Sequence, residues 1–64
     1  MNISDTHNAA AGSWIKETFR GDRSLGFVKN IDLRTNMMLV HFPKVHNSTW
    51  LSWRNNGQYK VINL

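Results

Sequence analysis

Two neighbouring stretches in the middle of the chain carry the clearest hydrophobic pattern. Leu25 to Asp32 is rich in apolar and β-branched residues, and Met37 to Phe42 places alternate apolar side chains on one face. Between them, Leu33 to Asn36 is polar enough to turn, and asparagine tolerates the left-handed backbone of tight turns. The pattern predicts a β-hairpin over residues 25–42.

The first stretch of this hairpin does not alternate strictly. Val28 and Ile31 are both apolar, yet strict alternation would place them on opposite faces of a sheet. A β-bulge near Lys29 and Asn30 brings both side chains inside, and bulges of this kind curl small sheets. Gly26, which has no side chain, lets another strand or a ring pass close to the backbone. We therefore expect a strongly curved sheet.

Three further segments have the composition of short strands. Trp14 to Phe19 is β-branched and aromatic, and although its spacing also suits one amphipathic helical turn, the glycine at position 21 favours a strand. Thr49 to Trp53 alternates, and Arg54 to Gln58 has the residues of a turn. Tyr59 to Asn63 forms a fifth strand that can pair with the first.

Five short strands separated by turns predict an all-β fold, a small five-stranded SH3-like (Tudor-like) barrel over residues 13–64. The alternative is an open three-stranded sheet. Pro43 ends the third strand because proline cannot donate to a ladder, and Lys44 to Ser48 is a polar connector. A 3₁₀ turn fits Asn55 to Gln58. Residues 1–12 have no periodicity and are predicted to form a flexible N-terminal tail or linker.

Composition narrows the function classes. The chain has 64 residues, no cysteine and a net charge of +4. Its length indicates one domain, and the lack of cysteine excludes disulfides and thiolate zinc sites. No stretch is apolar for long enough to span a membrane, and the first residues lack the layout of a signal peptide, so we expect a cytoplasmic protein without a membrane partner. The basic balance favours polyanions or an acidic protein face.

Catalytic and metal-binding patterns are lacking in the sequence. No serine has the surroundings of a nucleophile, no glycine-rich phosphate loop is present, and Glu17 has no acidic partner nearby. His41 and His46 lie five residues apart across a proline, and His7 lies in the tail, which is not the spacing of a zinc ligand set. We expect no enzyme activity, no cofactor and no metal.

The aromatic residues are the most informative feature. Three tryptophans, three phenylalanines and one tyrosine are more than so narrow a barrel can enclose. Leu51 and Trp53 share one face of the predicted fourth strand, and Trp50 projects from the other. Trp50 is therefore either a contact residue at the surface or a lid over one end of the barrel, and Phe27 poses the same choice.

Two uses of such a surface compete. In one, the aromatic rings stack on bases while cations meet phosphates, and in the other the same face docks on a protein. The candidate binding residues are Trp50, Phe27, Lys29, Arg34, Lys44 and Arg54. An aromatic cage for methyl-lysine needs several rings around an acidic residue, and sequence alone does not place Trp14, Phe42 and Tyr59 in one.

The order of these segments resembles a known family. Gly26 to Ile31, then Met38 to Pro43, Trp50-Leu51 and Tyr59 to Ile62 are similar to the Tudor-like and KOW-like SH3-type barrels. The pattern particularly resembles the Tudor-like modules of RapA and of UvrD-type helicases, and Polycomb-like Tudor domains show much the same spacing. The resemblance implies a docking module whose partner is RNA polymerase, nucleic acid or a modified histone tail.

These observations predict a non-catalytic binding module that docks on nucleic acid or on a protein of the transcription or repair machinery. The alternative is an adaptor or inhibitor of the phage or mobile-element type that binds and regulates a single enzyme. The oligomeric state, the partner's identity and the choice between DNA, RNA and protein stay open at this stage.

Overall fold

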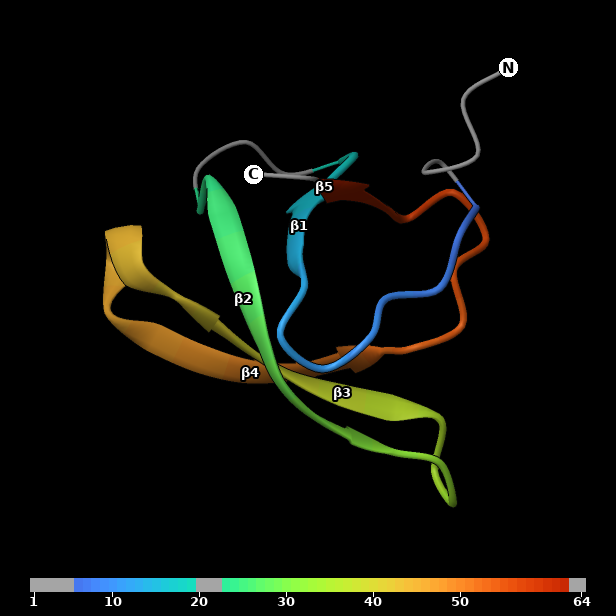
Figure 1. Ribbon diagram of the computed structural model, residues 1–64. Helices are drawn as coiled ribbons and strands as arrows, with labels where there is room; N and C mark the ends of the chain where they lie inside the picture. Colours follow the sequence, from blue (N-terminus) through green and yellow to red (C-terminus); the bar gives the residue numbers. More distant parts are fainter. Residues whose placement is uncertain (1–5, 20–22, 63–64) are drawn as a thin grey trace.

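The computed structural model describes residues 6–19 and 23–62, and this part of the chain forms one antiparallel β-sheet (Figure 1). Its elements are β1 (Trp14–Glu17), β2 (Leu25–Asp32), β3 (Met37–Phe42), the 3₁₀ helix η2 (Pro43–Val45), β4 (Asn47–Ser52) and β5 (Tyr59–Ile62). The five strands lie in the order β4-β3-β2-β1-β5. The predicted all-β, five-stranded fold is confirmed, and the three-stranded alternative is wrong.

The hairpin of β2 and β3 follows the predicted pattern. Val28 pairs with Val40, whereas the next pair joins Asn30 to Leu39, so the register shifts by one residue at Lys29. This is the predicted bulge. Asn36 has a φ of 55°, the left-handed backbone expected at the end of the turn.

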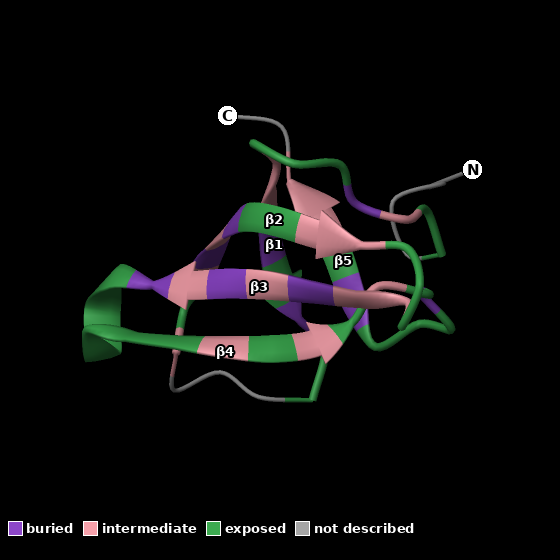
Figure 2. Ribbon diagram, turned by 90° about the horizontal axis from the view of Figure 1, so that it is seen from below, coloured by how far each residue is buried: buried purple, intermediate pink, exposed green. Residues whose placement is uncertain are grey.

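The core lies on the concave side of the curled sheet. Its fully buried side chains come from β1, β2 and β3, namely Ile15, Val28, Met38, Val40 and Phe42, and Tyr59 of β5 joins them. Figure 2 shows buried and half-buried residues alternating along β3, which is the period-2 pattern of a sheet with one covered face. Partly buried Ile31, Leu51, Trp53 and Val61 pack around this cluster.

The last strand of the chain pairs with the first at one edge of the sheet. β5 pairs with β1 from Tyr59↔Glu17 to Ile62↔Trp14, as the sequence predicted. β4 and β5 are the two edges of the sheet, and we call the opening between these two edges the seam.

The N-terminal segment differs from the prediction of a flexible tail. Ala9 is only 3% exposed and belongs to the core cluster. Its amide donates to the Tyr59 hydroxyl at 3.0 Å, and its carbonyl accepts from Trp53 Nε1 at 2.6 Å. Asn55 hydrogen-bonds the two residues that precede Ala9. The tail prediction therefore does not describe residues 7–12, while residues 1–5 lie outside the described part.

Several predicted boundaries shift by a few residues. β1 ends at Glu17 rather than Phe19, and it is a strand rather than a helical turn. β4 starts at Asn47, two residues early, because η2 already completes the connection after Pro43.

The 3₁₀ turn expected at residues 55–58 is not found there. The Asn55 Oδ1 atom accepts from the amides of Gly57 and Gln58 at 3.0 and 3.1 Å, so a side chain replaces the backbone bond of a 3₁₀ turn. Gly57 supplies the φ of 85° that this turn needs.

Candidate functional site

The convex side of the sheet carries the side chains that point away from the core. We call this side the outer face. Burial alternates along β1 and β3, and the pairing register of the other strands extends this pattern, so one set of residues lies on the outer face. The set is Trp14, Lys16, Leu25, Phe27, Asn30, Asp32, Met37, Leu39, His41, Ser48, Trp50, Ser52, Lys60 and Ile62.

A row of large side chains crosses the outer face from β5 to β3. Ile62 pairs with Trp14, Trp14 with Phe27, and Phe27 with His41. The rings of Trp14 and Phe27 meet edge to face, with centroids 5.2 Å apart and planes at 61°. All four residues are half-buried, so this row, which is apolar apart from His41, is still partly open to solvent. Cross-strand aromatic pairs of this kind also fix the register of β1 on β2.

Trp50 lies on the same face, on the neighbouring strand β4, two residues from Ser48, which pairs with His41. Trp50 pairs with Leu39, which is two residues from His41 on β3. Trp50 is 49% exposed, whereas Trp53 packs against the core and bonds the N-terminal segment. The structure places Trp50 with the surface residues, as the strand pattern predicted.

Lysines border this aromatic surface. Lys29 is exposed in the bulge of β2, two residues from Phe27. Lys16 lies opposite Leu25 on one side and opposite Lys60 on the other. The described acidic residues contribute little negative charge here, since Glu17 points inward and Asp32 lies 3.7 Å from Arg34.

The structure brings together only part of the predicted site. Phe27, Trp50 and Lys29 belong to the outer face or its bulge. Arg34 lies in the β2–β3 turn, and Arg54 follows Trp53, whose backbone amide donates to the Asn36 carbonyl of that turn. Lys44 lies in η2 at the opposite end of β3. These four cations therefore do not form a single cluster.

Sequence reasoning did not select Trp14, Lys16 and His41 for this surface. The period-2 pattern places Trp14 and Lys16 on one face of β1, but only the pairing of β1 with β2 shows that this is also the face of Phe27. His41 lies on the side of β3 opposite Phe42 and is half-buried there, with Nδ1 2.9 Å from Ser48 Oγ.

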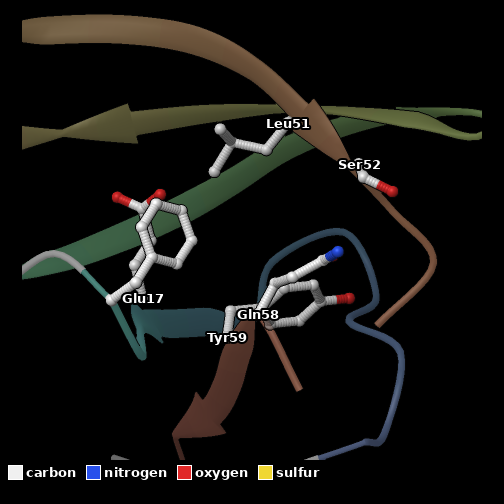
Figure 3. Close-up of a pocket in the computed structure, with 6 residues that line it drawn as sticks. Glu17, Leu51, Ser52, Gln58 and Tyr59 are labelled. Carbon is white, nitrogen blue, oxygen red and sulfur yellow. The ribbon is translucent and has the colours of Figure 1, made fainter. Parts of the chain in front are cut away.

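A second feature is a cavity of about 210 Å³ at the seam between the sheet edges. Its lining residues are Glu17, Phe19, Leu51, Ser52, Gln58 and Tyr59. Figure 3 shows Leu51 and Ser52 of β4 on one side and Glu17, Gln58 and Tyr59 on the other. Burial raises the pKa of the Tyr59 hydroxyl above its ordinary 10.0, and the bond from the Ala9 amide lowers it by less.

The carboxylate in the cavity wall already has a cationic partner. Glu17 Oε1 lies 2.6 Å from Arg23 Nη2 and 3.0 Å from its Nε, and both side chains are nearly buried. The Arg23 guanidinium also lies 4.2 Å from the centre of the Phe42 ring. Because Arg23 pairs with Glu17, the described lining residues offer no unpaired acid to a cationic ligand.

The three rings considered for a methyl-lysine cage do not surround a common pocket in the described part of the chain. Trp14 lies on the outer face, Phe42 is buried in the core, and Tyr59 lines the cavity. Within the described residues, no group of three or more histidine or acidic side chains is placed to hold a metal ion. The described chain also contains no helix with the length and apolar character needed to cross a membrane.

The chain matches no protein-family model, no curated protein and no solved structure. What the fold and the surface define is a small all-β protein with a basic, aromatic sheet face.

Proposed function

We propose that this protein is a non-catalytic, SH3-like (Tudor-like) module that binds single-stranded nucleic acid through the outer face, within a cytoplasmic complex that handles nucleic acid. The observation that carries the proposal is the surface formed by Trp14, Phe27 and Trp50 on one side of the sheet, with Lys16 and Lys29 beside it.

Half-buried and exposed aromatic rings can stack on the bases of a nucleic acid whatever its nucleotide sequence. Each base has a flat apolar surface, and stacking on an aromatic side chain contributes about 1–3 kcal/mol per base. Trp50 has the largest free ring surface on the outer face, whereas the edge-to-face pair of Trp14 and Phe27 holds two rings in fixed positions. Fixed rings lose little side-chain entropy when a base binds.

The charge pattern suits phosphates. The chain carries eight lysines and arginines against four acidic residues. Lys16 and Lys29 are exposed next to the rings, and Arg34 and Arg54 extend the positive charge beyond one end of the hairpin. A phosphate backbone lying across the rings would release counterions from these groups, which gives binding a steep dependence on salt.

Titration of the intrinsic tryptophan fluorescence with a single-stranded oligonucleotide tests the proposal. We expect quenching, and an affinity that falls as salt rises. Trp50→Ala should weaken binding about 5-fold to 150-fold, the equivalent of one lost stacking contact. Lys16→Ala and Lys29→Ala should each lower the slope of log K against log salt by about one.

Phe19→Ala is the matched control for Trp50→Ala. Phe19 is 67% exposed but lines the cavity rather than the outer face, so its removal should leave oligonucleotide affinity unchanged. The melting temperature of Trp50→Ala should stay close to wild type, because an exposed ring contributes little to the core. No detectable binding at low salt would contradict the proposal and leave the regulatory adaptor that docks on one protein.

A further inference from the structure

Among the residues that the structure describes, the backbone of β4 has no strand paired with it on the side away from β3. The Trp53 backbone amide donates to the Asn36 carbonyl at 2.8 Å, so the N–H and C=O groups of Trp53 face β3. Every second residue of an antiparallel strand directs its backbone groups to the same side, so those of Leu51 and Thr49 also face β3. The peptide groups of Ser48, Trp50 and Ser52 therefore face the seam. Among the described residues, β4 pairs with no strand other than β3.

This edge lacks the usual protection against pairing with another chain. Natural edge strands are blunted by lysines, prolines, inward-pointing charges or bulges. From Asn47 to Trp53 the sequence has no charged residue and no proline, and β4 pairs with β3 in an unbroken register. The edge also borders two exposed rings, Trp50 on the outer face and Phe19 across the cavity.

The sequence of β4 is close to self-complementary. Around Trp50 it reads Ser48-Thr49-Trp50-Leu51-Ser52, with a serine two residues away on each side and a medium-sized side chain next to the tryptophan on each side. An antiparallel pair of identical strands has a two-fold axis, so such a sequence pairs with its own copy. The occupant that this edge fits is a second copy of the chain.

We propose that two copies pair through β4, antiparallel, with Trp50 opposite Trp50 on the two-fold axis. In this register Ser48 lies opposite Ser52 of the other copy. All three outward-facing peptide groups are then used, which gives about six backbone hydrogen bonds between the copies. The two indoles become a cross-strand aromatic pair.

The register also avoids opposing like charges. Arg54, the first charged residue after β4, comes level with His46 of the other copy rather than with another arginine. The two sheets become one continuous sheet whose outer faces point the same way. The dimer thereby joins two aromatic, basic surfaces at the Trp50 pair, which goes beyond the binding function proposed for one chain.

Charge substitutions at Ser48 and Ser52 test both the dimer and its register. We expect the protein, free of nucleic acid, to sediment at twice its 7.4 kDa mass at high concentration. S48K/S52K places lysine opposite lysine at two points and should raise the dimer dissociation constant at least about tenfold. S48K/S52E places lysine opposite glutamate at the same two points and should remain dimeric.

Leu33→Lys combined with Thr35→Lys is the control for added charge. Both positions are exposed in the β2–β3 turn, so this variant carries the same two extra charges and should remain dimeric. A wild-type protein that stays at 7.4 kDa up to millimolar concentration overturns the proposal. So does an S48K/S52E variant that dissociates as readily as S48K/S52K.

Amide hydrogen exchange of the wild-type protein gives a second test that needs no variant. The amides of Ser48, Trp50 and Ser52 should become protected as protein concentration rises, while those of Thr49 and Leu51, bonded to β3, should be protected throughout. Fast exchange of the first three at every concentration contradicts the pairing. Both experiments are read without nucleic acid, so their outcome is independent of the outer-face proposal.

Discussion

Gly26 lies where β2 passes over two buried side chains. A Cβ atom built at this position would lie 2.5 Å from Val40 Cγ1 and 2.7 Å from Phe42 Cε1, both fully buried and without room to move. Gly26→Ala should therefore lower the free energy of unfolding by about 1–3 kcal/mol, the usual cost of overpacking a core. Urea denaturation followed by tryptophan fluorescence measures the loss.

A double-mutant cycle separates this overlap from other effects of alanine. Val40→Ala removes the atom nearest to the new methyl group, so the double variant should lose less stability than the sum of the two single variants. Strictly additive losses would show that the close approach to Val40 is not the cause.

At the scale of elements, the N-terminal segment is attached to the sheet through Tyr59. The Tyr59 hydroxyl accepts from the Ala9 amide and donates to the Trp53 carbonyl at 2.7 Å. Tyr59→Phe leaves a buried amide and carbonyl without this partner and should cost about 1–3 kcal/mol. Hydrogen exchange at Ala9 should rise in this variant, because the segment opens more readily.

The same contacts predict a pH dependence of stability. Burial raises the pKa of Tyr59 in the folded protein above the value of 10.0 that it takes in the unfolded chain. The folded state then holds its proton more tightly, so this stabilisation is complete below pH 10.0 and is lost as pH rises through the folded pKa. The drop in unfolding free energy above pH 10.0 should be smaller in Tyr59→Phe. An equal drop in both proteins would contradict this role.

The elements that sequence alone predicts are those whose signal is local. The hairpin of β2 and β3 follows from period-2 alternation, its bulge from the misplaced Ile31, and its turn from Asn36. By contrast, residues 7–12 have no periodicity, because they join the core through backbone bonds to distant side chains. A run of alanines carries no sign of such partners.

The candidate surface was predicted only where its residues follow from the local pattern of one strand. The alternation of β4 separates Trp50 from Leu51, so its exposure follows from local sequence. The residues around Phe27 depend on the register of β1 against β2, which places Trp14 beside Phe27. The sequence of either strand alone does not specify this register. Arg34 precedes β3 and Lys44 follows it in η2, so the length of β3 separates these two cations, and they lie at its opposite ends.

At the scale of the whole molecule, the excess of positive charge acts against the stability of the fold. The chain has a net charge of +4, and Lys16 lies directly opposite Lys60 on neighbouring strands of the outer face. Like charges directly opposite on paired strands are destabilising, by the same order as the 0.2–1 kcal/mol or so that a favourable cross-strand pair contributes. A polyanion that binds only the folded protein across this face would stabilise it by mass action, so the free energy of unfolding should rise when an oligonucleotide is added.

Lys16→Glu should therefore change stability and binding in opposite directions. It replaces a like-charged cross-strand pair with an opposite pair, which should raise the free energy of unfolding by up to about 1 kcal/mol at low salt, and it should weaken oligonucleotide binding. Lys44→Glu, in η2 and away from Lys60, makes the same change in net charge. If Lys44→Glu stabilises the fold as much as Lys16→Glu, the repulsion belongs to the net charge of the molecule and not to the outer face. If only Lys16→Glu stabilises, the effect belongs to the position of Lys16 opposite Lys60 on the outer face and not to the net charge of the molecule.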